Sequence, residues 1–459
     1  MKKTVATEVL DKDLKNVHMI SLGCARNLVD SEVMLGLMRD RGYAITPDPS
    51  EADVIVVNTC GFIMSAKQES VDTILEASEY KNPKKGKCKN LVVAGCMAER
   101  YPGEIKDSLP EVDLVLGTAG FNVIADELSK IQGSGKGKQA VRVDFERIKD
   151  YDLPRVNTQP FYTAYLKLAE GCAKRCSFCI IPALRGPLRS RSVESLTKEA
   201  KDLVAGGVKE LNLIAQDLTD YGRDRKDGAT LEKLLENLVS VKGLDWIRLF
   251  YVYPDQLSDG VIAMMKSEKK ICNYLDVPVQ HIDDDVLKRM NRKTSGKQIE
   301  DMLIRLKEEV PGIVLRTSLM VGFPGETQEQ FQKLCDFVQK GYLDQVGVFT
   351  YSSEEGTNSA KLYEDDISQE EKERRQALLY DIQNTVVREK MESWIGKTLD
   401  VLVEGPHPET ELLLKGRHYG QAPEIDNATF INKGQAKVGQ IVKVRVTELA
   451  GMDLVGEVV

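Results

Sequence analysis

The sequence predicts a multidomain α/β protein made of three folded parts. We expect an open parallel α/β sheet over residues 15–135, a partial β/α barrel over 161–391 and a small β-barrel over 392–459. The chain has 459 residues, which is too long for one hydrophobic core. Short β-branched runs alternate with longer helical patterns in the first two parts, whereas the last part alternates strands with turn residues.

The composition is that of an ordinary globular protein. Hydrophobic residues make up 42% and charged residues 29% of the chain, and the formal charge is 63 − 71, or −8. This balance gives no general attraction to nucleic acid and argues against an RNA substrate. The first residues lack the apolar core of a signal peptide, and no apolar run is long enough to span a membrane. Nine cysteines in such a chain indicate a reducing cytoplasm and metal binding rather than disulfides.

The N-terminal part carries four candidate strands, and a cysteine follows each of the first three. The strands are expected at residues 17–21, 54–57, 91–94 and 114–116, and the cysteines are Cys24, Cys60 and Cys96. Loops that leave the carboxyl ends of adjacent parallel strands share one edge of the sheet, so the three thiols should gather there. An iron-sulfur cluster with one open iron is favoured over three half-buried loop cysteines.

A second cysteine set lies in the motif CxxxCxxC, formed by Cys172, Cys176 and Cys179. Structural zinc requires four protein ligands, and no fourth Cys or His lies near this loop in the sequence, so zinc is disfavoured. Thiolates suit a 4Fe-4S cluster, which would keep one iron open to an exogenous ligand. The alternative is three buried thiols in a reduced protein. The remaining cysteines are expected in a solvated lysine-rich loop (Cys88) and in the core (Cys272 and Cys335).

The central part contains six candidate strands, at 163–168, 210–215, 246–251, 274–279, 313–320 and 345–349. Active groups of such barrels lie at the carboxyl ends of the strands. Gln216 follows the second strand, Gln280 the fourth and the sequence GFPGE, residues 322–326, the fifth. Arg316 lies inside an otherwise apolar strand and therefore needs a carboxylate partner. An internal Asp or Glu and the carboxylate of a bound ligand are equally good candidates.

Two segments complete the chain. Residues 136–160 are rich in Gly, Pro and polar side chains and are expected to form a linker with a short strand at 140–143. From Ser393 onward the C-terminal part has seven Lys and Arg against nine Asp and Glu, a balance poorly suited to binding phosphates. Such a barrel is better suited to meeting a basic protein.

The motif GCAKRCSFCIIPALRGPLRSRS resembles the radical S-adenosylmethionine superfamily and, within it, the methylthiotransferases. The stretches SLGCARNLVDSE and GRHYGQAPEIDNATFI are similar to the RimO-type branch, and the C-terminal part resembles a TRAM domain. The resemblance implies that Cys172, Cys176 and Cys179 hold the radical 4Fe-4S cluster and that Cys24, Cys60 and Cys96 hold an auxiliary one. It also makes Phe178, Gln216, Gln280 and Arg316 candidate contacts of S-adenosylmethionine.

The activity that the resemblance implies is addition of a methylthio group to the β-carbon of an aspartate in the twelfth protein of the small ribosomal subunit. S-adenosylmethionine would be both the radical source and the methyl donor. The expected partners are that ribosomal protein and an electron donor such as flavodoxin or ferredoxin, with a monomeric enzyme in the cytoplasm and no membrane. Two alternatives remain: methylthiolation of a tRNA adenosine, as in the MiaB-like branch, and a non-catalytic iron-sulfur carrier or scaffold.

Overall fold

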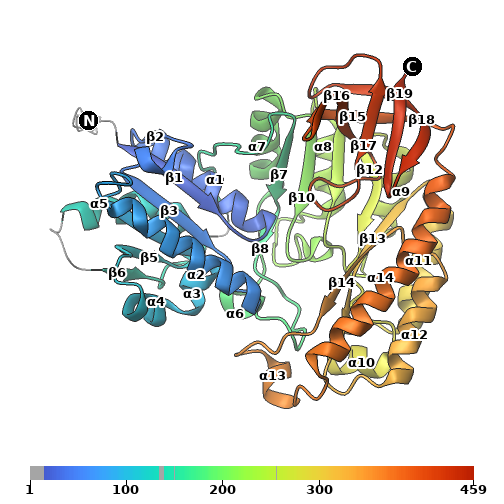
Figure 1. Cartoon of the computed structure of the whole chain (residues 1–459), viewed down its shortest axis with the longest axis horizontal. Helices are drawn as coiled ribbons and strands as arrows, with labels where there is room; N and C mark the ends of the chain where they lie inside the picture. The colour runs from blue at the N-terminus through green and yellow to red at the C-terminus, as the bar shows by residue number, and fades with distance from the viewer. Residues whose placement is uncertain (1–14, 134–138, 149, 255) are drawn as a thin grey trace. The chain divides into compact units, whose positions relative to one another are not determined.

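The computed structural model describes residues 15–133, 139–148, 150–254 and 256–459, and the chain divides into two compact units. The first unit contains the chain up to Thr158 together with the short segment Ala183–Gly186. The second unit contains Gln159–Pro182 and Pro187–Val459. The chain therefore returns to the first unit for four residues directly after the CxxxCxxC loop (Figure 1).

The first unit is built on a six-stranded sheet in the order β2-β1-β3-β4-β5-β6, with every neighbouring pair parallel. Its strands are β1 (Asn16–Ser21), β2 (Ala44–Ile45), β3 (Val54–Thr59), β4 (Asn90–Gly95), β5 (Leu114–Leu116) and β6 (Ala140–Arg142). Its α-helices are α1 (Ala25–Asp40), α2 (Met64–Ser78), α3 (Cys96–Arg100), α4 (Pro102–Ser108) and α5 (Ile124–Gly133). The open parallel sheet predicted from the sequence is confirmed.

Both faces of this sheet are covered, because successive strand residues point to opposite sides. Val54 and Val56 pack in a core cluster with residues of α1 and α5, while Ile55 and Val57 pack in a separate cluster with residues of α2, α3 and α4. Cys88 belongs to this second cluster and is buried, so the solvated position expected for it is wrong. Cys272 and Cys335 are buried as expected, and burial raises the pKa of all three thiols to about 11.

The segment expected to be a linker, residues 136–160, is packed against the first unit over much of its described length. Ala140–Arg142 form β6, close to the short strand expected at 140–143, and extend the first sheet beyond β5. Further along, Tyr151, Leu153 and Val156 pack against the core under α1, and Arg155 pairs with the buried Glu32. Apolar side chains spaced among polar ones hold this segment on the first unit, which its Gly and Pro content did not reveal.

The second unit contains another six-stranded parallel sheet, in the order β14-β13-β12-β11-β10-β7. Its strands are β7 (Thr163–Lys167), β10 (Glu210–Ile214), β11 (Trp246–Leu249), β12 (Ile271–Asp276), β13 (Val314–Val321) and β14 (Gln345–Thr350). A separate short pair is formed by β8 (Ala169–Glu170) and β9 (Arg189–Ser190). This open sheet of β/α repeats is the expected partial barrel.

Helices cover one face of this sheet, and the other face is polar. The helices of this part are α7 (Val193–Ala205), α8 (Leu231–Val239), α9 (Asp259–Ser267), α10 (Asp284–Arg289), α11 (Gly296–Glu309), α12 (Gln328–Gln339), α13 (Asn358–Leu362) and α14 (Gln369–Glu392). The short helix α6 (Ile181–Arg185) begins in this unit and continues into the segment Ala183–Gly186 of the first unit. Leu211 and Leu213 of β10 pack in the main core with residues of α7 and α8. Their neighbours Glu210 and Asn212 point to the opposite face and are buried and polar.

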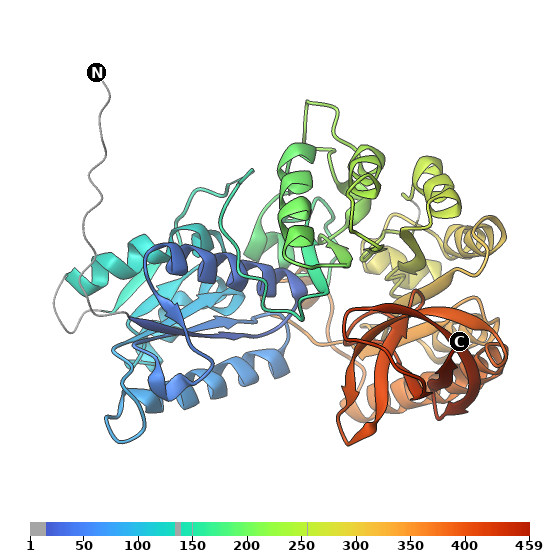
Figure 2. The same ribbon diagram turned by 90° about the horizontal axis from the view of Figure 1, so that it is seen from above.

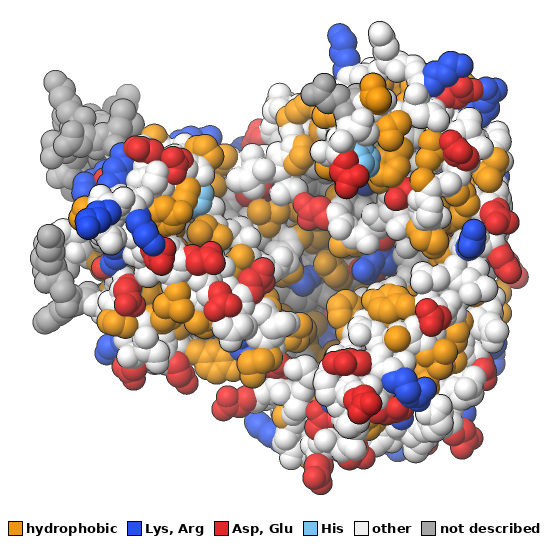
Figure 3. Space-filling model, viewed as in Figure 1, with side chains coloured by type: hydrophobic (Ala, Val, Ile, Leu, Met, Phe, Trp, Pro, Cys, Tyr) orange, Lys and Arg blue, Asp and Glu red, His pale blue; other side chains and the backbone are white. Residues whose placement is uncertain are grey.

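The C-terminal part is a closed barrel in the order β15-β16-β17-β19-β18, seen from above in Figure 2. Its strands are β15 (Thr398–His407), β16 (Thr410–His418), β17 (Thr429–Lys433), β18 (Ile441–Ala450) and β19 (Asp453–Val458). On the barrel face visible in Figure 3, acidic and basic side chains are mixed with hydrophobic ones. No helix in the described part of the chain is long and apolar enough to cross a membrane.

A buried charge cluster joins the barrel to the central sheet within the second unit. Glu210 of β10 accepts hydrogen bonds from Arg417 of β16 (Nη2 to Oε2, 2.7 Å) and from Arg248 of β11 (Nη2 to Oε1, 3.1 Å). Burial alone would raise the pKa of Glu210, but the two guanidinium groups lower it to about 2. The carboxylate is therefore ionised and serves as the electrostatic link between the two sheets.

Candidate functional site

The first candidate site lies at the carboxyl edge of the N-terminal sheet. Cys24 precedes α1 after β1, Cys60 directly follows β3, and Cys96 directly follows β4. Since β1, β3 and β4 are neighbours in the sheet, the three predicted cysteines leave three adjacent strands at the same edge. The thiols are close enough to interact electrostatically, since Cys24 acts on Cys60 and both of these act on Cys96.

Two glycines let the backbone approach these thiols closely. Gly23 has a φ of 84°, and a Cβ at this position would lie 2.9 Å from Cys60 Cβ and 3.1 Å from its sulfur. A Cβ at Gly61 would lie 2.9 Å from the backbone of Met97, next to Cys96. The small residues noted in the sequence thus bring the loops after β1, β3 and β4 into contact.

A buried guanidinium completes this site. Arg185, from the segment that returns to the first unit, is 1% exposed and forms an ion pair with Asp30 (Nη1 to Oδ2, 3.0 Å). Its Nη2 donates to Asn27 Oδ1 at 3.2 Å and to the sulfur of Cys96 at 3.6 Å. No local signal in the sequence connects Arg185 to a sheet more than 80 residues upstream.

The thiols of this site titrate differently. Burial raises the pKa of Cys96 to about 11 and also raises that of Cys60. For Cys24, burial is outweighed by the charges of Arg26 and Arg185 and by backbone hydrogen bonds, so its pKa is lowered. Arg185 opposes the rise at Cys60 and Cys96, so one cation acts on all three thiols.

The second candidate site is the loop of Cys172, Cys176 and Cys179 in the second unit. The end of α10 holds this loop: Ser177 donates its N–H to Met290 O at 2.9 Å and its hydroxyl to Arg289 O at 2.8 Å. Asn291 Nδ2 donates to Arg175 O at 2.6 Å. Phe178 packs against the apolar cluster formed by Val286, Met290, Phe323 and Tyr351. Its placement therefore anchors the loop.

Cationic groups surround this loop. Lys174 Nζ pairs with Asp220 (3.1 Å) and Asp217 (3.3 Å), and Arg292 Nη1 lies 4.0 Å from the sulfur of Cys176. Both cations lie over the ring of Tyr253, 4.6 Å and 4.4 Å from its centroid. Burial, opposed by the Lys174 N–H and assisted by Asp217 and Cys176, raises the pKa of Cys172 to about 11. Sequence reasoning missed Arg292, since its relation to the loop exists only in three dimensions.

Gln216 and Gln280 lie beyond the carboxyl ends of β10 and β12, as predicted. Gln216 Nε2 donates to Glu170 Oε1 at 3.1 Å, while its buried Oε1 has no hydrogen-bond partner among the described residues. Gln280 has a φ of 71°, a conformation rare for a residue with a side chain, and its backbone bridges to Leu319. The strand expected at 274–279 is β12, which runs from Ile271 to Asp276 and is followed by a loop. An orphan oxygen and a strained backbone at this edge suit a ligand site.

Arg316 finds its carboxylate partners inside the protein. Its Nη1 donates to Asp276 Oδ1 at 3.0 Å, and its Nε lies 3.6 Å from Asp426 Oδ1. Of the two partners considered from the sequence, the internal one is present, so no ligand carboxylate is needed to balance this charge.

The turn after β13, residues 322–326, is rigid. Buried Glu326 accepts the N–H groups of Gly322 and Phe323 and lies 3.6 Å from His281 Nε2. Gly322 has a φ of 71°, and a Cβ there would lie 2.3 Å from Lys372 Cγ. Only glycine fits this position, and the turn is held at the polar edge of the sheet.

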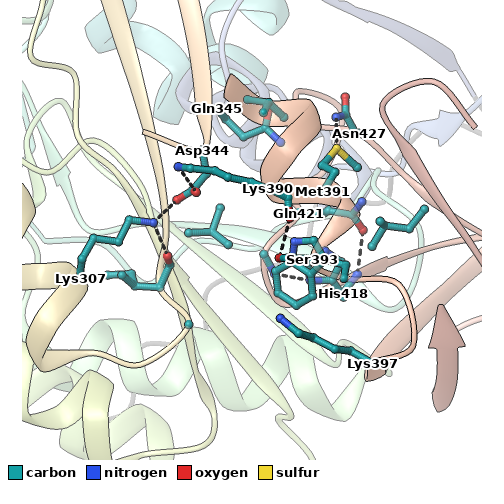
Figure 4. A pocket seen from close by; sticks show the side chains of 17 residues that line it. Lys307, Asp344, Gln345, Lys390, Met391, Ser393, Lys397, His418, Gln421 and Asn427 are labelled. Carbon is teal, nitrogen blue, oxygen red and sulfur yellow. Dashed lines mark hydrogen bonds and ion pairs between the residues drawn. The ribbon is translucent and has the colours of Figure 1, made fainter. Parts of the chain in front are cut away.

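A cavity of about 320 Å³ lies elsewhere in the second unit, between the central sheet and the barrel. Figure 4 shows Lys307 and Lys390 directed at Asp344, with hydrogen bonds of 2.5 and 2.7 Å, and His418 and Gln421 on the barrel side. Its lining contains none of the predicted site residues. The two lysines are engaged by Asp344 of the protein itself.

The donor sets fit iron-sulfur chemistry. Two groups of three cysteines match clusters that keep one iron open. Among the residues that the structure describes, no group of three or more His, Cys, Asp or Glu side chains is placed so that it could hold a metal ion as it stands. The fit therefore rests on thiol chemistry and on the strand order that gathers the first set.

Comparison with known proteins identifies the class of protein to which the chain belongs. Residues 16–117 match a family described as uncharacterized protein family UPF0004, residues 166–338 the radical SAM superfamily, and residues 395–459 the TRAM domain. A solved radical S-adenosylmethionine methyltransferase, TsrM from Kitasatospora setae, is similar in fold. Its TM-score is 0.55 at 14% identity, over 74% of this chain and 72% of that one. The fold and the CxxxCxxC loop thus define a radical S-adenosylmethionine protein with a C-terminal TRAM barrel.

Full-length relatives define the family more narrowly. The ribosomal protein uS12 methylthiotransferase RimO of Pelobacter propionicus is 50% identical over 97% of this chain and 98% of its own length. The protein of the same name from Geobacter sulfurreducens is 49% identical over 97% of this chain and 99% of its length. The chain belongs to the RimO family of methylthiotransferases, as its motifs predicted.

Proposed function

We propose that this protein adds a methylthio group to the β-carbon of an aspartate in ribosomal protein uS12. The observation that carries the proposal is the pair of three-cysteine sets, one in each unit, in a chain related to uS12 methylthiotransferases over its whole length. The enzyme is a radical S-adenosylmethionine transferase. A ribosomal protein substrate would put its activity in the cytoplasm.

In the proposal, Cys172, Cys176 and Cys179 bind the radical 4Fe-4S cluster, and Cys24, Cys60 and Cys96 bind a second one. When bound, the first would supply the electron that cleaves S-adenosylmethionine, and the second would hold the sulfur to be transferred. Flavodoxin or ferredoxin would be the electron donor, and the enzyme would act as a monomer. These assignments follow from the donor sets and the family.

The chain's own residues orient these components. α10 fixes the cysteine loop through Ser177 and Asn291, so that the three thiols stay at the polar edge of the sheet. Gln216 offers a buried, unsatisfied amide oxygen that can accept a hydrogen bond from the amino group of S-adenosylmethionine. Gln280, with its strained backbone, lies at the same edge, and Phe178 shapes the wall beside the loop. Since Arg316 is already paired with Asp276, we assign it a supporting role in holding β12 and β13 together.

The iron content of cysteine variants tests the ligand assignment. Full-length protein would be reconstituted anaerobically with iron and sulfide, and iron would be counted per chain. Cys172→Ala/Cys176→Ala/Cys179→Ala and Cys24→Ala/Cys60→Ala/Cys96→Ala should each lose half of the iron. The matched control Cys88→Ala/Cys272→Ala/Cys335→Ala removes three buried thiols outside both sets and should keep all of it. Full iron in either of the first two variants would exclude that set as ligands.

The substrate is tested separately. Reconstituted protein, S-adenosylmethionine and a reductant would be incubated with uS12 or with tRNA, and both substrates analysed by mass spectrometry. We expect a gain of one methylthio group on uS12 only. A gain on tRNA alone would favour the MiaB-like alternative, and the absence of 5'-deoxyadenosine in every reaction would favour an iron-sulfur carrier.

A further inference from the structure

We propose that Arg185 positions and electrostatically tunes the cluster of the first unit by binding the sulfur of its Cys96 ligand. This inference rests on the proposed function, because it assigns Cys24, Cys60 and Cys96 to a cluster. It adds a residue that lies outside both cysteine sets and comes from the segment Ala183–Gly186.

The geometry of Arg185 is that of a preorganised donor. The guanidinium is 1% exposed and is fixed on two sides, by Asp30 at 3.0 Å and by Asn27 at 3.2 Å. The Nη2 group that binds Asn27 also donates to the sulfur of Cys96 at 3.6 Å. The planar fork of arginine allows both contacts at once, which the point charge of lysine would not reproduce. Leu184, the preceding residue, is held by Thr118 and Arg147, which donate to its carbonyl at 2.9 and 3.1 Å.

The charge of Arg185 lies next to a ligand sulfur. The buried guanidinium donates an N–H to the sulfur of Cys96, so a fixed positive charge stands beside the proposed cluster. Three thiolates and an added electron accumulate negative charge, so a nearby cation and an N–H···S hydrogen bond stabilise the reduced cluster. Burial strengthens this effect because little water screens the interaction. Asp30 opposes it, since its carboxylate partly cancels the guanidinium charge.

An ion pair with only a structural role should not affect the potential of the cluster. Helix α1 forms such a pair, which serves as a comparison. Arg155 is 5% exposed and pairs with the fully buried Glu32, also on α1. Both arginines tie another segment to α1, but Arg185 contacts a thiol sulfur whereas Arg155 contacts the carboxylate of Glu32. Loss of either should cost stability. Only loss of Arg185 should change the reduction potential.

The test uses full-length protein with Cys172→Ala, Cys176→Ala and Cys179→Ala, so that only the cluster of the first unit is present. After anaerobic reconstitution with iron and sulfide, its midpoint potential would be measured by redox titration with electron paramagnetic resonance. Arg185→Met should shift the potential to a more negative value. Asp30→Asn should shift it to a more positive value, because the guanidinium is then less compensated. Arg185→Lys should give a smaller negative shift, and Arg155→Met should leave the potential unchanged.

Opposite signs for Arg185→Met and Asp30→Asn cannot come from a general loosening of the fold, which would move both variants the same way. Equal or same-sign shifts, or a shift in Arg155→Met as large as that in Arg185→Met, would overturn the inference. If Arg185→Met does not retain iron, the signs of the potential shifts in Asp30→Asn and Arg185→Lys test the inference instead. If the parent protein with three alanines binds no iron at all, the proposed ligand set fails instead, whatever residue is at position 185.

Discussion

At the scale of single residues, His418 shows how burial fixes a protonation state. It is 4% exposed, and its Nδ1 accepts the N–H of Gly420 at 3.0 Å, which requires a neutral ring. Burial, assisted by the charges of Arg248 and Arg417, lowers its pKa from 6.5 to about 3. The unfolded chain therefore takes up a proton at this residue below pH 6.5, whereas the folded chain does not.

The second unit should consequently lose stability as the pH falls from 6.5 towards 3. Above pH 6.5 both states are neutral at His418 and the contribution is fully present. His418→Asn keeps an acceptor for Gly420 but cannot titrate, so its stability should depend less on pH between 6.5 and 4.5. Thermal unfolding of both proteins across this interval measures the difference. Parallel curves would show that His418 is not the titrating group.

Among single residues, the sequence predicted the positions of the cysteines but not the contacts of the buried arginines. The order of strands and cysteines predicted that Cys24, Cys60 and Cys96 share one edge, because parallel topology determines this without side-chain detail. Arg185, Arg292 and the partners of Arg316 could not be predicted in this way. Their neighbours come from distant segments, and a long cationic side chain gives no sign of its direction in the sequence.

At the scale of elements, α10 links a helix cap to the cysteine loop. Asp283 caps this helix by accepting the N–H groups of Asp285 and Val286 at 3.1 and 3.2 Å, and the other end of the helix holds Ser177. Asp283→Ala should cost about 1–2 kcal/mol of stability and should also speed the loss of iron from the Cys172 set. The neighbouring Asp285→Ala, an exposed residue of the same type, should retain iron like the unmodified protein. The rates of chelator-induced bleaching compare the two variants. Equal rates would show that the capped helix does not stabilise iron binding by the cysteine loop.

The buried charge cluster that links β10 to β16 gives a second prediction. Glu210→Gln would leave Arg248 and Arg417 facing a neutral amide in a buried site, and we expect a loss of about 3–5 kcal/mol. Asp400→Asn removes an exposed ion pair with Lys443 and should cost no more than about 1 kcal/mol. Thermal unfolding of both variants at neutral pH checks the contrast. A cost for Glu210→Gln as small as that of Asp400→Asn would rule out an electrostatic link.

Element prediction from the sequence was good wherever a β-branched run lay beside a helical pattern. All six strands of the central sheet were expected, and β5 matched to the residue. The edge strand β6 was expected as a short strand at 140–143, but β2 is too short to give an alternating pattern of its own. It depends on pairing with β1, so only the assembled sheet reveals it.

At the scale of the whole molecule, the order of the units along the chain has energetic consequences. A fragment that ends at Thr158 lacks Leu184 and Arg185, which bind Thr118, Arg147 and Asp30 within the same unit. Such a fragment should unfold at a lower temperature than a version in which a Gly/Ser segment of equal length replaces residues 159–182 and the chain continues to Gly186. Differential scanning calorimetry measures both. Identical transitions would mean that the returning segment adds no stability.

The same excursion of four residues limits how natural or designed chimeras can be assembled. A recombination breakpoint at residue 158 would combine the sheet and α1 of one parent with the Arg185 of the other. The arginine and its partners on α1 must then be compatible. Exchange of the N-terminal half between relatives should therefore carry Ala183–Gly186 along as a second, separate graft.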